Sequence, residues 1–370
     1  MRHGITYFAV AVLVAAPGSL ALAQGTGTPI FPVPQDPNTR VATRGANFLE
    51  IGVGARAMGM GGAYTAIAQD VTALYWNPAG ISHITGVSAS LSVADLYGGL
   101  GIRHVFAGAV MPVGSSGAIG VSYIQLSSGD IERTTEASPE GNDPAFGAVF
   151  SWTSTAAELA YGRRLTDRLD LGVGFKFVTE GIDNASAGYL GFDIGTQFRT
   201  GLYGTTIGAA LVNLGTSGRF QGPAIQRFAI DEFRPGATAV EFRTTSNPMP
   251  TAFRFGVRTD LMGSAEALLS GAGDNHLVMT GEILDGIDTD VNYTLAAEYN
   301  FRGMLFLRAG KRWVNEAHTE SFRTGGYGLS YGGGLSIPLG GSGRRIGFDY
   351  AHTNMGELNN IQIYSFALGF

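Results

Sequence analysis

The sequence predicts an all-β protein, folded as a transmembrane antiparallel up-and-down β-barrel of about 14 strands. Three observations predict this fold. Apolar residues alternate with small or polar residues along many segments, the long connections between these segments lie mostly at one end, and the chain stops on an aromatic residue. Alternation with a period of two gives a strand one apolar face and one polar face.

The segment 169–177, LDLGVGFKF, shows the alternation clearly. Its apolar face consists of Leu169, Leu171, Val173, Phe175 and Phe177. Its other face consists of Asp170, Gly172, Gly174 and Lys176. The segments 190–198, 253–260 and 291–299 follow the same pattern. In a soluble sandwich such apolar faces pack against each other, whereas in an outer-membrane barrel they contact lipid and the polar faces line the lumen.

The connections separate these two folds. Strands are expected at 86–97, 102–112, 117–127, 154–163, 168–180, 186–199, 204–213, 249–260, 274–284, 290–301, 304–314, 327–338, 344–352 and 359–370. Connections after even-numbered strands are mostly tight, apart from 261–273, whereas long ones follow odd-numbered strands, at 128–153, 214–248 and 315–326. Short periplasmic turns opposite long outer loops are typical of outer-membrane barrels. We therefore expect a barrel in the cell outer membrane, surrounded by outer-membrane lipid.

The chain ending, NNIQIYSFALGF, supports the same prediction. It places Tyr364, Phe366, Leu368 and Phe370 on alternate positions. This ending resembles the terminal signal of outer-membrane proteins that the barrel-insertion machinery binds, so we expect that machinery as a partner. An ordinary buried last strand would explain the alternation but not the final aromatic residue. Barrel closure requires this strand to pair with the first one.

The N-terminus predicts export. Residues 1–23 have the features of a signal peptide, with a positive charge at Arg2, an apolar stretch over 5–22 and an A-L-A cleavage pattern. A membrane anchor is the weaker interpretation, because turn-forming residues interrupt the apolar stretch and no positive cluster follows it. Residues 24–45 are expected to form a flexible N-terminal segment.

Composition excludes several classes of function. The chain has no cysteine, which excludes a disulfide framework and thiolate metal sites. The net charge of −6 and the lack of a basic block argue against nucleic acid as a partner. The 56 glycines occur beside many aromatic residues, so they do not predict disorder. The histidines show no spacing typical of metal ligands, and we expect no metal site.

Two short motifs are found in enzymes, but their surroundings argue against that function here. Residues 52–57 fit the dinucleotide fingerprint G-x-G-x-x-A, which requires alternating strands and long helices downstream. Residues 328–332 fit the hydrolase motif G-x-S-x-G, which requires a strained turn from a strand into a helix. Neither context is predicted. We expect no enzymatic activity, no catalytic residue and no cofactor.

Residues 48–80 resemble the N-terminal signature of the PorV/PorQ family. The matching parts are Gly54-Ala55-Arg56-Ala57, Gly59-Met60-Gly61-Gly62-Ala63, Asp70, and the run from Ala73 through Asn77, Pro78 and Ala79 to Gly80. That family belongs to a larger group of fourteen-stranded barrels typified by the fatty-acid transporter FadL. The resemblance implies that residues 46–85 fold back into the lumen as a plug of short helices and that 86–370 form the barrel.

The residues of the predicted plug suit that position. Close backbone packing is expected at the glycines 52, 54, 59, 61 and 62. Asp70 is expected to cap a short helix over 71–76, which Asn77 and Pro78 would end. Arg56 would need a carboxylate partner inside the lumen. The candidates are Asp170, Asp193, Glu298 and Asp349.

Two regions leave their roles open at this point. Charges of both signs are expected to face the lumen, including Lys176, Arg254, Arg258, Glu282, Arg308 and Arg312. They would form either a wet pathway or, as we favour, ordinary ion pairs that fill a barrel interior. The long connection 214–248 would either contact partners or fold over the barrel as a lid.

Two functions follow from the resemblance. The first is a non-catalytic component of type IX protein secretion, which receives or shuttles cargo and contacts secretion components through outer loops such as 128–153 and 214–248. The alternative is a FadL-like channel for fatty acids or other hydrophobic small molecules. It predicts an apolar groove from the outer loops to residues 77–79 and a lateral opening at a kinked strand.

Overall fold

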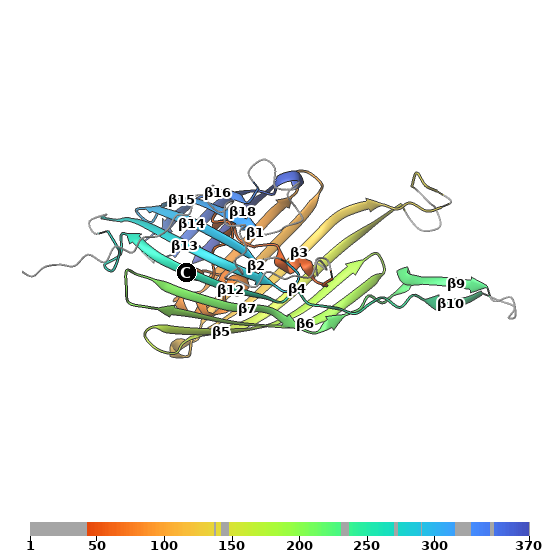
Figure 1. The fold of residues 1–370 in the computed structure, drawn as a ribbon, viewed down its shortest axis with the longest axis horizontal. Helices are drawn as coiled ribbons and strands as arrows, with labels where there is room; N and C mark the ends of the chain where they lie inside the picture. Colours follow the sequence, from red (N-terminus) through yellow and green to blue (C-terminus); the bar gives the residue numbers. More distant parts are fainter. Residues whose placement is uncertain are drawn as a thin grey trace, which may run out of the picture. The chain divides into compact units, whose positions relative to one another are not determined.

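The computed structural model describes residues 43–136, 138–141, 148–230, 237–269, 273–289, 291–314, 327–340 and 344–369. All of them belong to one unit of the chain, Arg40–Phe370. The predicted signal peptide and Phe370 lie outside the described residues. Within the described part, fourteen antiparallel strands close into a barrel (Figure 1), as the sequence predicts.

The barrel strands overlap the fourteen predicted segments one by one. They are β1 (Ser88–Leu96), β2 (Ile102–Pro112), β3 (Ala118–Glu132), β4 (Val149–Arg164), β5 (Leu169–Ile182), β6 (Ala185–Arg199), β7 (Thr206–Gly215), β12 (Ala252–Met262), β13 (Asn275–Gly286), β14 (Asn292–Phe301), β15 (Leu305–Val314), β16 (Leu329–Leu339), β17 (Arg344–Asn354) and β18 (Asn360–Gly369). The barrel closes between its first and last strands, from Ser88 opposite Gly369 to Asp95 opposite Gln362. The barrel therefore leaves no free strand edge.

Two predicted connections differ from the structure. The connection expected at 128–153 is shorter, because β3 continues to Glu132 and β4 begins at Val149. The connection expected at 214–248 contains strands of its own: β8 (Ser217–Gly218) pairs with β11 (Asn247–Pro248), and β9 (Gln226–Ile230) pairs with β10 (Ala237–Glu241). β8 and β11 have two residues each, and the sequences of β9 (QRFAI) and β10 (ATAVE) do not alternate strictly between apolar and polar residues, so the sequence did not indicate these strands. The predicted loop at 315–326 lies outside the described residues.

The two faces of the wall have opposite chemistry. On β5, Phe175 and Phe177 face outward and are 42% and 56% exposed, whereas Lys176 between them faces the lumen and is 2% exposed. Outward-facing Leu91 and Phe366 repeat the pattern at the closure of the barrel, with 47% and 42% exposure. Apolar side chains outside and polar ones inside define a transmembrane barrel and exclude a soluble sandwich.

Among the described residues, no helix is long and apolar enough to cross a membrane. The helices are short, and most of them lie in the plug before β1. These are η2 (Asn47–Glu50), α1 (Ala55–Gly59), α2 (Ala73–Trp76) and η3 (Pro78–His83). Most plug side chains are fully buried and belong to the same apolar core as lumen-facing residues of the barrel. Because α1 contacts β15–β18 and η3 contacts β3–β6, the plug touches different parts of the wall with its two ends.

Candidate functional site in the plugged lumen

The C-terminal part of the plug, residues 63–83, packs directly against the backbone of the wall. A Cβ atom added to Gly172 would lie 2.1 Å from the carbonyl carbon of Pro78, and one added to Gly195 would lie 2.0 Å from the Asn77 side-chain oxygen. At Gly208 it would lie 2.6 Å from the Thr65 carbonyl oxygen. No side chain larger than a hydrogen atom fits at these positions. Close packing was expected at glycines of the plug but not at these glycines of the wall. Glycine at lumen-facing positions of alternating strands is the sequence signal that marks them.

Polar contacts hold the same part of the plug. The fully buried Asn77 side chain donates to the carbonyl oxygens of Thr65 (2.9 Å) and Thr196 (3.0 Å) and accepts from the Ala79 amide. From the wall, Gln197 donates to the Thr65 and Ala68 carbonyl oxygens at 3.1 and 2.9 Å. One carboxylate oxygen of Glu282 on β13 accepts from the amides of Tyr64 and Thr65, each at 2.8 Å. The backbone of residues 64–79 is thus bound at several points.

Asp70 binds the residue that precedes α2 and does not cap the helix itself. Its carboxylate accepts from the Thr72 amide at 3.0 Å and from the Thr72 hydroxyl, but α2 begins only at Ala73 and Thr72 is its N-cap. The end of α2 agrees with the prediction, since Asn77 has an extended backbone with φ −164° and ψ 102°. Pro78 then begins η3, which the sequence did not predict. A carboxylate can satisfy amides of a turn as well as those of a helix.

Arg56 lies in a chain of ion pairs between the plug and the wall. Its guanidinium donates two hydrogen bonds to Glu298, at 2.9 and 2.7 Å, and one to Asp70 at 3.2 Å. Arg308 donates to the same Glu298 carboxylate at 2.6 Å and also pairs with Asp349. Burial alone would lower the pKa of Arg56, but Glu298 and Asp70 raise it above its ordinary value. Arg56 therefore stays charged and bound to β14.

The other predicted partners of Arg56 pair elsewhere. Asp170 binds Arg199 at 2.6 Å and His83 of the plug at 3.0 Å, and Asp193 binds Lys176 at 2.6 Å. Arg258 pairs with Asp260 at 2.8 Å. Ion pairing of this kind agrees with the interpretation that we favoured for these lumen charges.

Arg254 and Arg312 bind the plug without forming ion pairs among the described residues. The Arg254 guanidinium lies over the rings of Tyr75 and Trp76, 4.9 and 4.6 Å from their centroids. Arg312 donates to the Gly61 carbonyl oxygen at 2.7 and 3.2 Å.

The segment around α1 approaches a different part of the wall. A Cβ atom at Gly59 would lie 3.3 Å from the Cα atom of Gly332, and one at Gly310 would lie 2.5 Å from the carbonyl carbon of Met60. The Ala55 amide donates to the Ser365 hydroxyl at 2.8 Å. Gly59 thus packs closely, as predicted, but with glycine also on the wall side.

A cavity of about 380 Å³ lies between the plug and the outer ends of the strands. Half of its lining residues are apolar or aromatic: Phe48, Ile51, Met58, Trp76, Tyr97, Leu126, Trp152, Leu284, Met355 and Ile361. Its charged residues are Glu50, Arg254, Glu282 and Arg312. Arg254 is 4% exposed, and two of its nitrogens have no hydrogen-bond partner among the described residues. We call this space the outer cavity.

A second cavity of about 460 Å³ lies at the opposite end, where the chain enters β1 and leaves β18. Its lining is more polar and includes Arg56, Asp70, Arg308, Arg345 and Asp349. We call it the inner cavity. Residues 77–79 line neither of these two cavities, so the groove expected to lead to them is not found there. The plug instead places Gly52, Met58 and Trp76 at the outer cavity.

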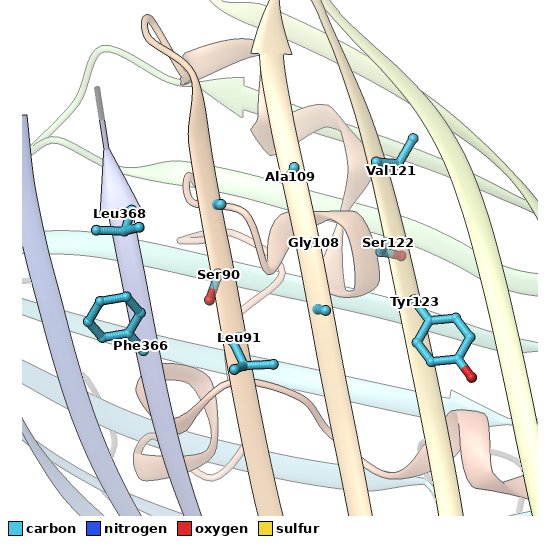
Figure 2. A pocket seen from close by; sticks show the side chains of 11 residues that line it. Ser90, Leu91, Gly108, Ala109, Val121, Ser122, Tyr123, Phe366 and Leu368 are labelled. Atoms are coloured by element: carbon cyan, nitrogen blue, oxygen red, sulfur yellow. The ribbon is translucent and has the colours of Figure 1, made fainter.

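An apolar depression of about 590 Å³ lies on the lipid-facing surface of the wall, outside the barrel. Figure 2 shows Leu91, Tyr123, Phe366 and Leu368 on this face, on β1, β3 and β18. The depression does not coincide with a break in the wall, because β1 pairs continuously with both β18 and β2 here. Register shifts occur elsewhere, between Ser127 and Asp130 and between Phe192 and Ile194. The predicted lateral opening is therefore not seen at this face.

The two enzyme motifs lack the local structure that they have in enzymes. Residues 52–57 belong to the plug, and Ser330 lies within β16, where its hydroxyl donates to Thr353 at 3.1 Å. Within the described ranges, no three potential metal ligands cluster.

Comparison with known proteins identifies the fold. No family model matches the chain, and no curated protein matches it. Among solved structures, the CymD monoaromatic hydrocarbon channel is 12% identical, with a TM-score of 0.52 over 86% of this chain and 98% of that one. The toluene transporters TodX of Pseudomonas putida (12% identity, 86% and 96% coverage) and TbuX of Ralstonia pickettii (13%, 86% and 97%) both give 0.51. The chain shares the fold of these barrels.

Proposed function

We propose that the chain is a non-catalytic outer-membrane channel for hydrophobic small molecules. The outer cavity carries this proposal, because apolar and aromatic side chains form half of its lining beside a few polar groups. Such a lining is typical of sites for small apolar ligands. The barrels with the same fold are titled as channels or transporters for toluene and other monoaromatic hydrocarbons. In this proposal the chain is exported by residues 1–23 and inserted through its last strand.

Tryptophan fluorescence tests the proposal. Trp76 and Trp152 line the outer cavity, whereas Trp313, the third tryptophan of the chain, is 45% exposed on the outer face of β15. The variant Trp313→Phe therefore reports on the cavity alone. In proteoliposomes we expect toluene to change the tryptophan emission of the Trp313→Phe protein in a saturable way. The same titration with oleate tests an anionic hydrophobic ligand.

The matched control is Trp152→Phe in the same background, which should remove part of the saturable change. A response that rises linearly with toluene, or that does not depend on Trp76 and Trp152, would reflect partition into lipid. That result would contradict a hydrophobic-ligand site in the outer cavity.

A second candidate is an accessory role in type IX protein secretion of the PorV/PorQ kind. Two observations favour it: the signature at residues 48–80, and the outer connection whose β9 and β10 form a ribbon of their own. Cargo and secretion components would bind there. A pull-down from outer membranes should recover them with the intact chain and lose them when 226–241 are deleted. Equal recovery of these partners with the intact and the shortened chain, or no recovery with either, would reject this role.

A further inference from the structure

Two neighbouring turns at the periplasmic end of the wall carry an excess of positive charge. One turn, 165–168, joins β4 to β5, and the other, 200–205, joins β6 to β7. The Arg199 amide donates to the Arg168 carbonyl oxygen at 2.8 Å, so the two turns lie side by side. We call residues 163–170 and 199–205 the basic rim. It contains four arginines, at 163, 164, 168 and 199, and only two carboxylates, at 167 and 170.

Asp170 compensates only part of this charge. Its carboxylate is fully buried and binds Arg199 at 2.6 Å and Arg164 at 3.6 Å, beside His83 at 3.0 Å. Arg163 and Arg168 are exposed, and neither forms an ion pair within the described part of the chain. These two guanidinium groups can therefore bind an anion that comes from outside the chain.

The opposite ends of the same strands carry the opposite charge. At the outer end of β3 and in the described residues that follow it, Glu132, Glu136 and Glu140 are exposed, and Asp183 is exposed in the turn after β5. Arg133, the one arginine in these described residues, pairs with Asp183 at 2.8 Å. The positive excess is thus a property of the periplasmic end of β4–β7 and not of the whole wall.

The position of Arg163 indicates where the anion lies. Arg163 is directly opposite Leu171 on β5, and residues directly opposite each other in antiparallel strands share one face of the sheet. This is the lipid-facing surface, on which Tyr161 is also exposed. Leu165 and Leu202 add exposed apolar side chains on the two turns. Aromatic residues at the ends of membrane strands are typical of the headgroup level, so an anion bound by Arg163 lies beside the barrel, within the membrane interface.

We propose that the basic rim binds the phosphate group of an anionic phospholipid in the periplasmic leaflet of the outer membrane. Arg163 and Arg168 hold the phosphate, because a guanidinium group can donate paired hydrogen bonds to phosphate oxygens. A hydrogen bond from the Leu165 amide to the Leu169 carbonyl oxygen, at 2.8 Å, keeps both arginines on one tight turn. Leu165 contacts the acyl chains next to the headgroup. This site lies outside the wall, so it does not depend on what the lumen binds.

Native mass spectrometry of the full chain in a neutral detergent measures which lipid stays bound. The probes are phosphatidylglycerol and phosphatidylcholine with the same acyl chains, so that only the headgroup differs. We expect the protein to retain phosphatidylglycerol with a preference of roughly tenfold, because two arginines near an anionic headgroup supply an attraction of that order. The preference should fall as the salt concentration rises.

The double variant Arg163→Gln and Arg168→Gln should abolish this preference. The matched control is the double variant Arg103→Gln and Arg243→Gln, which removes two exposed arginines at the outer end of the barrel. The control changes the net charge by the same amount and should leave the preference unchanged. Heat-modifiable migration on gels shows whether each variant is folded.

Three results would overturn the lipid site. The first is equal retention of the two lipids by the unsubstituted protein, and the second is an equal loss of preference in the two folded double variants. The third is displacement of phosphatidylglycerol by inorganic phosphate beyond the displacement by chloride at the same ionic strength. That result would assign the basic rim to free phosphate and not to a membrane lipid.

Discussion

Residues 63–83 of the plug lie on β3–β7, β12 and β13, whereas residues 54–62 lie on β14–β18. In both parts wall glycines let the plug backbone approach the wall closely, at Gly172 and Gly208 for the first part and at Gly310 for the second. The second part adds the ion pair of Arg56 with Glu298. Close packing resists displacement through many atoms, whereas a single ion pair can be removed by one substitution. The two parts of the plug therefore differ in how much one residue contributes to their attachment.

The largest expected effect on stability comes from the ion pairs of Glu298. Glu298→Gln removes the carboxylate that Arg56 and Arg308 share and leaves two guanidinium groups poorly compensated. We expect the free energy of unfolding to fall by about 3–5 kcal/mol, as for other broken buried pairs. Urea unfolding in lipid vesicles measures it.

The control for this variant is Asp183→Asn, which breaks the peripheral pair of Asp183 with Arg133. It should lower the free energy of unfolding by less than about 1 kcal/mol. Equal effects of the two substitutions would mean that Glu298 has no special part in holding the plug.

A smaller effect on stability is expected from the close packing of the plug against wall glycines. Gly172→Ala places a methyl group 2.1 Å from Pro78 and should lower the free energy of unfolding by about 1–3 kcal/mol. In the same strand, Gly181→Ala meets no atom closer than 3.5 Å and should change it by less than about 0.5 kcal/mol. The same unfolding measurement compares them. Tolerance of Gly172→Ala would show that the plug does not pack on β5 as described.

The smallest effect concerns Glu50, a plug residue that lines the outer cavity. Partial burial and the neighbouring Asp288 carboxylate raise its pKa from 4.5 to about 7, against the opposing effect of Arg254. Since the folded protein favours the protonated form, this contribution to stability is full below pH 4.5 and is lost as the pH rises through about 7. The side chain keeps contact with solvent, so the change should stay below about 1 kcal/mol.

Thermal unfolding between pH 5 and pH 8 checks this prediction. Glu50→Gln should flatten the part of the profile near pH 7 while it leaves the rest unchanged. An unchanged slope in that variant would assign the pH dependence to other groups.

The barrel could be predicted because each strand carries its own signal. The alternation within 169–177 is enough to predict the two faces of that strand. The connection lengths predict which end of the barrel carries the outer loops and which carries the periplasmic turns. The ribbon of β9 and β10 could not be predicted, because apolar and polar residues do not alternate strictly in QRFAI or ATAVE.

The candidate site was only partly predictable. The need of Arg56 for a carboxylate follows from its burial, and Glu298 was among four candidates. The choice among them depends on which wall the plug faces, and the two residues are 242 positions apart in the chain. The cavities arise where the plug and the wall do not touch, so no local pattern encodes them.

Hydrogen exchange of the reconstituted protein compares the two attachments in one molecule. We expect the amides of residues 55–60 to exchange faster than those of Tyr64, Thr65 and residues 73–80. We also expect Glu298→Gln to accelerate exchange only in residues 55–60. Equal protection along the whole plug, or faster exchange over 73–80, would contradict a special contribution of Glu298 to the attachment of residues 55–60.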